Sequence, residues 1–225
     1  DFKFNEQRME GYRNFMNKIW NATRFSLSSL SDFKPPEDGV KAIPMKGHLS
    51  IYDQWIISKL AAVEKTVDES LEQDRFSDAA NALYAFTWYE FCDWYIEFIK
   101  PIINGPKTQE RESTQLVLAQ VLNRIMRLLH PFIPFISEEL YQKLPIKGHP
   151  CPVPQSPNTR NDKNFLELGS DAAAFELDVI KEVITSIRNI RGENRISPAL
   201  KIKARLSPNC DKAQKLLGNN RSAIE

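Results

Sequence analysis

Apolar positions along this chain recur mostly at steps of three and four, the spacing of an α-helix that buries one face. The first such segment runs from about Asn5 to Leu30, and a loop rich in proline and glycine follows it. A second helix is expected from Ser50, a suitable N-cap. We expect Ser77 to cap a third helix, and Pro101 to end it.

The second half of the chain continues the helical period and then changes character. A fourth helix is predicted over about Glu110–Leu129, and "ISEELYQKL" predicts a short fifth one after the paired prolines of "HPFIPF". Residues 145–169 are rich in proline and polar residues, which predicts a long irregular connection. Ser170 or Asp171 is then expected to cap a long sixth helix.

The last stretch contains the one good strand signal. "LKIKARL" alternates apolar and basic residues, and "CDKAQKLLGNN" after it predicts a short helix. We therefore expect a mainly α fold, with an α-helical bundle over residues 1–194 and the start of a small α/β module over residues 195–225. The unfinished pattern and the first residue, which is not methionine, also predict a fragment of a longer protein.

The third predicted helix is unusually aromatic, with eight aromatic residues between Tyr84 and Phe98. Its polar positions form a single narrow stripe: Glu90, Asp93, Glu97 and Lys100. A helix with this pattern is typical of the centre of a bundle, with one edge left for polar contacts.

Composition narrows the class of protein. Of the 225 residues, 42% are apolar and 26% are charged, as in an ordinary globular protein. No uncharged stretch is long enough to cross a bilayer, and no secretory signal is visible. The three cysteines are far apart in the sequence, which favours a cytoplasmic setting over a disulfide framework.

Charge is unevenly distributed behind a net value of +1. Residues 49–98 hold three basic and ten acidic residues, whereas residues 181–205 hold seven basic and two acidic ones. Such asymmetry can orient a protein on a polyanion. The alternative is that both stretches are solvated helix faces.

The residues offer no catalytic constellation and no metal site. The glycines are scattered rather than clustered in a phosphate-binding loop, and no base is paired with a nucleophile. His149 and Cys151 are the one close pair of possible metal ligands, which is too few for a zinc site. His130 precedes Pro131 and is expected to make a hydrogen bond at a helix end.

The first predicted helix has a better signal, for binding. Its polar and aromatic residues line up along one side: Arg13, Asn17, Trp20, Asn21 and Arg24. Guanidinium, carboxamide and indole groups suit an unpaired nucleic-acid segment, by phosphate binding, base-edge pairing and stacking. The alternative places Trp20 in the core and pairs both arginines with acids such as Asp93 and Glu97.

Four sequence motifs resemble one enzyme family, in the family's order and at suitable spacing. "GYRNFMNKIWNATRF" resembles the helix that opens the anticodon-binding domain of valyl-tRNA synthetases, and "YEFCDWYIEFIKPII" resembles their central bundle helix. "RLLHPFIPFISEELYQKLP" and "IRNIRGENRISPALKI" resemble the segments that follow. The isoleucyl and leucyl enzymes share the HPF-type segment, but the first two motifs point to valine.

The resemblance implies that this chain belongs to an ATP-dependent valine–tRNA ligase whose catalytic and editing domains lie outside it. The ATP and Mg²⁺ chemistry would belong to that catalytic domain, and this chain would hold neither cofactor nor metal. Its expected role is to grip the anticodon stem-loop of valine tRNA, in a cytoplasmic and monomeric parent enzyme. The alternative is a helical scaffold that docks a protein partner.

The resemblance also implies which residues contact the anticodon. Arg13, Asn17, Asn21 and Arg24 match the first-helix motif, and Phe33 matches a loop position where a ring can stack on a base. Trp94 lies in the central-helix motif, with a place in the core as its alternative. The near-neutral charge predicts weak and strongly salt-dependent binding of tRNA by this part alone.

Overall fold

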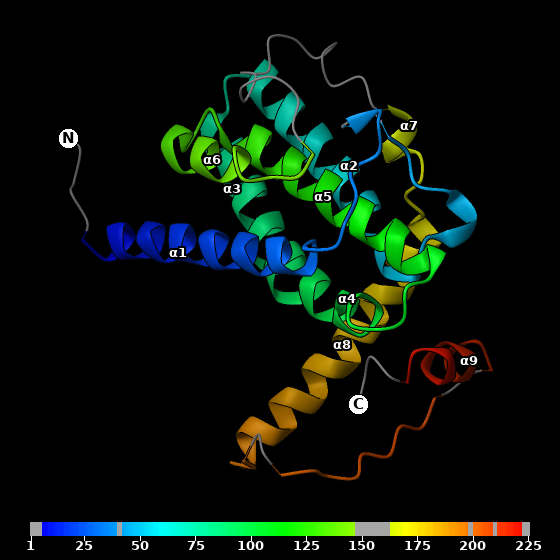
Figure 1. The fold of residues 1–225 in the computed structure, drawn as a ribbon. Helices are drawn as coiled ribbons and strands as arrows, with labels where there is room; N and C mark the ends of the chain where they lie inside the picture. Colours follow the sequence, from blue (N-terminus) through cyan, green and yellow to red (C-terminus); the bar gives the residue numbers. More distant parts are fainter. Residues whose placement is uncertain (1–5, 40–41, 147–162, 198–199, 209–210, 222–225) are drawn as a thin grey trace. The chain divides into compact units, whose positions relative to one another are not determined.

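The computed structural model describes residues 6–39, 42–146, 163–197, 200–208 and 211–221 (Figure 1). These residues form two compact units, residues 1–170 and 171–225. The first unit is a helical bundle. Its elements are α1 (Glu6–Ser29), the short 3₁₀ helix η2 (Lys46–His48), α2 (Ile51–Glu72), α3 (Phe76–Ala85), η3 (Phe86–Tyr95), α4 (Ile96–Ile103), α5 (Gln109–Leu129), α6 (Pro134–Tyr141) and α7 (Lys163–Leu166).

The second helix starts where the sequence predicts. The Ser50 hydroxyl accepts a hydrogen bond from the Asp53 N–H, and the Asp53 carboxylate accepts one from the Ser50 N–H. This reciprocal capping box satisfies two backbone donors at the start of α2. The prediction of Ser50 as N-cap is confirmed.

The predicted cap at Ser77 is wrong. At the end of α2 the chain makes a Schellman turn, in which the Arg75 N–H bonds to the Ser70 carbonyl and Asp74 adopts a φ of 57°. This tight turn leads the chain directly into α3 at Phe76, so Ser77 already lies inside the first helical turn. The backbone of the turn, rather than a serine side chain, fixes where α3 begins.

The aromatic helix is one continuous helical run from α3 through η3 to α4. Its middle, η3, is a π-helix of ten residues, a rare form in which the backbone bonds to the fifth residue along. The prediction that Pro101 ends this helix is wrong, because Pro101 lies inside α4. Proline removes only one backbone donor, and α4 ends two residues later, so the loss of bonding is confined to the last turn.

The longest buried stretch belongs to α5, which packs against α2, α4 and α6. Between α2, η3 and α5 lies the Asp53 carboxylate, which is fully buried. It accepts hydrogen bonds from the Ser50, Thr114 and Tyr95 hydroxyls at 2.7, 2.7 and 2.8 Å. Burial raises the pKa of Asp53, and these hydrogen bonds oppose the rise. The network joins three helices through one side chain.

A second buried polar contact joins α5 to α2. The Arg124 guanidinium donates to the Glu64 carboxylate at 2.9 Å, and both side chains are more than nine-tenths buried. At the far end of α5, the His130 Nδ1 lies 3.0 Å from the Ser137 hydroxyl, which confirms the expected hydrogen bond. α6 then begins at Pro134, as predicted from the paired prolines.

The second unit contains α8 (Asp171–Glu193) and α9 (Asp211–Asn219), both at the expected places. The strand expected at "LKIKARL" is wrong: residues 201–208 form no helix or strand in the described part of this unit. Alternating side chains favour an extended backbone, but a strand needs a partner for its hydrogen bonds.

The described residues confirm a mainly α fold with a helical bundle. The start of an α/β module over residues 195–225 is not shown. The domain boundary expected near Asn194 stays a prediction. The long connection expected over residues 145–169 lies mostly outside the described residues, and its described end holds the short helix α7.

Candidate nucleic-acid interface

Four predicted contact residues lie together on one exposed side of α1. Arg13, Asn17, Asn21 and Arg24 are all exposed, and the Trp20 ring beside them is 40% exposed. We call these five residues the α1 strip. The core does not cover it, so its donors and its ring are open to a ligand.

The alternative, in which acids of the aromatic helix neutralise the arginines, is wrong. The Asp93 carboxylate pairs instead with Lys18, and Glu97 pairs with Lys100 at 2.6 Å. Arg13 makes an exposed ion pair at 3.3 Å with Glu10, one turn earlier on the same helix. Such a surface pair contributes little and breaks easily. Among the described residues, Arg24 has no ion-pair partner.

Two lysines fasten α1 to the aromatic helix and so leave the arginines outside. The Lys18 ammonium lies 3.9 Å from the centre of the Trp88 ring in addition to its pair with Asp93. The Lys100 ammonium lies 5.2 Å from the Phe25 ring. Both contacts are cation–π interactions on the flank of α1. They fix the rotation of α1 that presents the strip.

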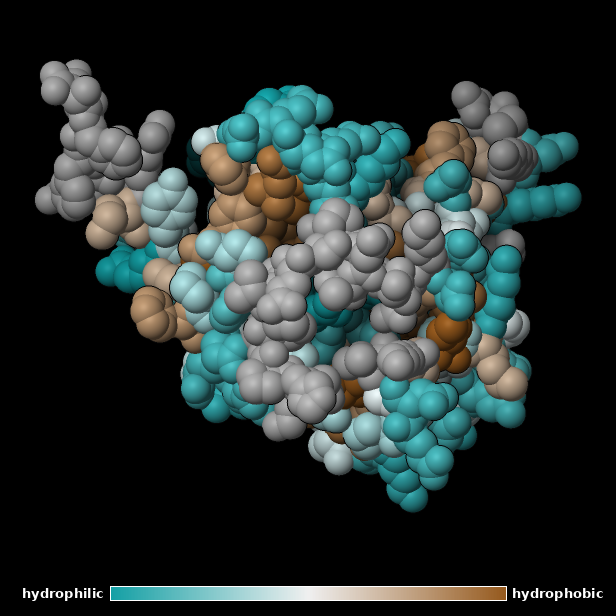
Figure 2. Space-filling view, turned by 90° about the horizontal axis from the view of Figure 1, so that it is seen from above, coloured by the Kyte–Doolittle hydropathy of each residue, from teal (hydrophilic) through white to brown (hydrophobic). Residues whose placement is uncertain are grey.

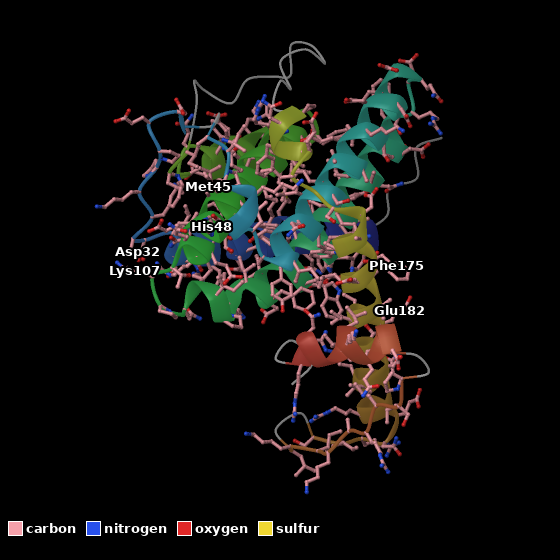
Figure 3. The ribbon with its side chains drawn as sticks, turned by 90° about the vertical axis from the view of Figure 1, so that its right-hand side faces the viewer. Asp32, Met45, His48, Lys107, Phe175 and Glu182 are labelled. Atoms are coloured by element: carbon pink, nitrogen blue, oxygen red, sulfur yellow. The ribbon has the colours of Figure 1, made fainter. Side chains whose placement is uncertain are left out.

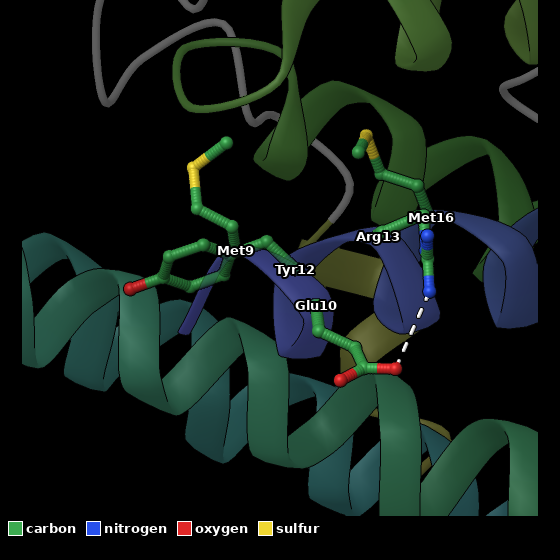
Figure 4. Close-up of a pocket in the computed structure, with 5 residues that line it drawn as sticks. All are labelled: Met9, Glu10, Tyr12, Arg13 and Met16. Carbon is green, nitrogen blue, oxygen red and sulfur yellow. Dashed lines mark hydrogen bonds and ion pairs between the residues drawn. The ribbon is translucent and has the colours of Figure 1, made fainter. Parts of the chain in front are cut away.

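The other side of α1 behaves differently along its length. Phe15 and Ile19 are buried, and Thr23 continues their row into the core. Tyr12 and Met16, whose spacing places them on the same apolar side, are exposed, as is Met9. In Figure 4 the Met9 and Met16 side chains point to the same side of the helix, while Glu10 and Arg13 point away from them. The bundle covers Phe15, Ile19 and Thr23 but leaves Met9, Tyr12 and Met16 open.

The loop after α1 holds Phe33 and is anchored through its neighbour Asp32. The Arg111 guanidinium donates to both Asp32 carboxylate oxygens at 3.0 Å, and the Gln115 amide donates at 2.9 Å. Lys107 adds an outer contact at 3.4 Å (Figure 3). These donors, Arg111 first, hold the pKa of Asp32 well below its usual range. Phe33 itself is half-buried.

Trp94 lies at the edge of an aromatic cluster rather than on a free surface. Its ring is half-buried and stacks on Phe98, with centroids 5.4 Å apart. Phe98 in turn stacks on Tyr52 at 5.1 Å and meets the edge of Trp55. The ring of Trp94 therefore has a packing role in the first unit, and one part of it reaches the surface.

The structure thus brings four of the six predicted site residues onto one helix face and places Phe33 just past the end of that helix. Trp94 lies apart from them, in the aromatic cluster. Sequence analysis missed Lys18, Asp32 and Arg111, which orient the strip and the loop. Their signal is weak, because Asp32 and Arg111 are far apart in the sequence and meet only in the fold.

Other kinds of site are less well supported. Across the described ranges, no group of three histidine, cysteine or acidic residues is placed to hold a metal ion. His149 and Cys151 lie outside the described residues. Burial raises the pKa of the Cys92 thiol to about 12, so this thiol is a poor nucleophile. Of the helices in the described part of the chain, none has the length and apolar character to cross a membrane.

Comparison with known proteins identifies the family of this chain. A family described as "Anticodon-binding domain of tRNA ligase" matches residues 53–206, well over half of the chain. The match includes Trp94 and the aromatic helix. It begins after α1 and the Phe33 loop, so five of the six predicted contact residues lie outside it.

Three relatives, all named valine–tRNA ligase, match the chain over nearly its whole length. The protein from Bdellovibrio bacteriovorus is 69% identical over 224 residues, covering 100% of this chain and 25% of the relative. Those from Geobacter sulfurreducens and Bacillus cereus are 45% and 36% identical, covering 96% and 100% of this chain. They are covered over 23% and 24% of their own length.

The chain therefore spans about a quarter of the relatives' length. The family match, an anticodon-binding domain, is consistent with the helical bundle that this quarter forms. The chain belongs to the family of anticodon-binding domains of tRNA ligases.

Proposed function

We propose that this chain is the tRNA-recognition part of a valine–tRNA ligase and that it grips the anticodon stem-loop of valine tRNA. The observation that carries the proposal is the exposed α1 strip, with Arg24 unpaired among the described residues and Arg13 held only by a surface pair. The proposal names valine as the amino acid because the relatives are named valine–tRNA ligase.

The chemistry of the strip suits unstacked RNA. Carboxamides such as those of Asn17 and Asn21 can pair with base edges, guanidinium groups bind phosphate or stack, and the Trp20 indole offers a face for a base. The Phe33 ring, next to the anchored Asp32, offers a second stacking surface beyond the end of α1. Trp94 contributes through the part of its ring that reaches the surface.

Such a domain positions a substrate rather than transforming it. Holding the anticodon end fixes the direction of the rest of the tRNA, so the acceptor end reaches a distant catalytic site. ATP and Mg²⁺ would act there, in the part of a cytoplasmic, monomeric ligase outside this chain. The alternative of a protein-docking scaffold is not favoured, because the family match concerns anticodon binding.

Binding assays test the proposal directly. In a gel shift with transcribed valine tRNA and a tRNA of different anticodon, this chain should bind the valine tRNA more tightly at low salt. Binding should weaken steeply as salt rises, since phosphate contacts release counterions. Equal binding of both tRNAs, or no shift at low salt, would contradict the proposal.

A further inference from the structure

An apolar groove of about 850 Å³ lies in the first unit, between the first half of α1, α3 and the corner that joins α5 to α6. Its walls include Tyr12 and Phe15 from α1, Leu83 and Tyr84 from α3, and Leu129 and Phe132 from the corner. None of the residues that line it carries a formal charge.

The apolar face of α1 continues past the edge of the bundle at this groove. Met9 is 56% exposed and Tyr12 is 62% exposed, although Tyr12 lies on the same side of the helix as the buried Phe15 and Ile19. In Figure 1 the N-terminal end of α1 extends beyond α3 and α6. An apolar helix face that outruns its packing partner indicates a second partner.

Exposed aromatic rings occur next to the groove residues in sequence. Phe76 precedes Ser77, a lining residue, and is 60% exposed. Phe135 follows Pro134, next to the lining residue Ile133, and is 91% exposed. Figure 2 shows apolar surface, in brown, between hydrophilic edges on the face seen from above. Tyr12 and Met16 line the groove, and Met9 shares a second hollow with them; three exposed large apolar side chains so close together are unusual for a surface that only water contacts.

The character of the groove decides between kinds of occupant. A nucleic-acid backbone needs cations, and the lining residues offer none. An apolar protein segment matches the lining, with the Asn81 and Ser77 side chains available for its backbone. The Bdellovibrio relative is matched over only 25% of its length, so most of such a ligase is protein outside this chain.

We propose that the groove and the exposed row of Met9, Tyr12 and Met16 dock an apolar segment of the same ligase polypeptide, from the part outside this chain. The inference rests on the proposed function, because it takes the chain as one part of a longer ligase. In that ligase, α1 presents its arginine side to tRNA and its apolar side to the rest of the enzyme.

Site-specific photocross-linking in the full-length ligase tests this. A benzophenone amino acid replaces Tyr12 in one protein and Ser77 in another, so that each wall of the groove carries a probe. A third protein carries it at Met45, an equally accessible position (66% exposed) on the loop before α2. Mass spectrometry then identifies the cross-linked peptides.

We expect both groove probes to recover the same apolar segment of the same polypeptide, and the Met45 probe to recover none of it. Combining Met9→Glu with Met16→Glu should remove most of the cross-link from Ser77, because a charge in an apolar contact loses its hydration. Cross-links to tRNA, cross-links between two copies of the ligase, or no cross-link would overturn the inference.

The same preparation separates the two proposals. If it charges valine tRNA but gives no intramolecular cross-link, the docking inference fails and the proposed function stands. If it cross-links as expected but charges no valine tRNA, the proposed function fails and the docking surface stands.

Discussion

Asp32 and Arg111 form a two-pronged ion pair that fastens the loop after α1 to the first turn of α5. Both nitrogen–oxygen distances are 3.0 Å. The Arg111 Nε also donates to the Ile103 carbonyl at 2.7 Å, so one guanidinium joins the loop, the end of α4 and the start of α5. Planar guanidinium and carboxylate groups fit each other in this way, which gives direction as well as attraction. The position of Phe33 depends on this joint.

Arg111→Ala should therefore weaken tRNA binding without touching the RNA. Loosening the loop removes part of the stacking by Phe33, and stacking of one base is worth about 1–3 kcal/mol, so the Kd should rise by up to about tenfold. Titration of the full-length ligase with valine tRNA measures this. Lys107→Ala is the control, because its exposed ammonium makes only the outer contact. Equal effects of the two substitutions would contradict the account.

The Asp32 joint also predicts a pH dependence of stability. The pKa of Asp32 is lowered in the fold, chiefly by Arg111, so the folded state favours the carboxylate. Its contribution is fully present above the unfolded pKa of about 3.9 and is lost as pH falls below that value toward the folded pKa. The difference in unfolding free energy between wild type and Asp32→Asn should be constant from neutral pH to about pH 5 and shrink below about pH 4. A difference that grows with acidity would contradict this sign.

Asp53→Asn should destabilise the first unit more than the same kind of substitution at an exposed acidic residue. The buried carboxylate accepts from Ser50, Thr114 and Tyr95, and an amide would turn two hydrogens toward donors. Leaving buried polar groups unpaired costs about 1–3 kcal/mol, measurable by urea unfolding. Asp74→Asn is the control: Asp74 is exposed with a φ of 57°, a conformation that asparagine adopts readily. If both variants unfold alike, the Asp53 network has no structural role.

Trp94 should reveal a packing role in addition to any RNA contact. Trp94→Ala removes the ring that stacks on Phe98 and should lower the unfolding free energy by about 2 kcal/mol, less than a fully buried tryptophan would. Trp94→Phe keeps a stacking ring and should recover most of the loss. Full stability of the alanine variant would instead place the ring at the RNA surface alone.

Much of the fold could be predicted from the helical period of the sequence. The bounds of α1, α2, α5 and α8 follow from periodic apolar positions and from the Ser50 cap. The failures have specific causes. The start of α3 is set by a backbone turn at Asp74, and the π-helical register of η3 has no signal in a pattern based on 3.6 residues per turn.

The candidate site was predictable in its residues but not in its surroundings. The pattern places the α1 strip on one side of the helix. Only the fold shows that Asp93 forms its ion pair with Lys18, which leaves the arginines without this partner. The exposure of Tyr12 could not be foreseen either, because apolar spacing shows which side is apolar but not how far the bundle reaches. Contacts between segments distant in sequence, such as Asp32 with Arg111, require the fold itself.

The central claim is that the exposed side of α1 reads the anticodon of valine tRNA. It is tested by kcat/KM for aminoacylation in the full-length ligase, with valine tRNA and with the same tRNA carrying an altered anticodon. Arg13→Ala and Arg24→Ala should each cost about 1–3 kcal/mol of transition-state stabilisation, which lowers kcat/KM for valine tRNA about five- to 150-fold. Each should also reduce the discrimination against the altered tRNA. Arg75→Ala, which removes an arginine in a similar exposed pair on another surface, should change neither. Unchanged discrimination in the Arg13 and Arg24 variants would contradict the claim.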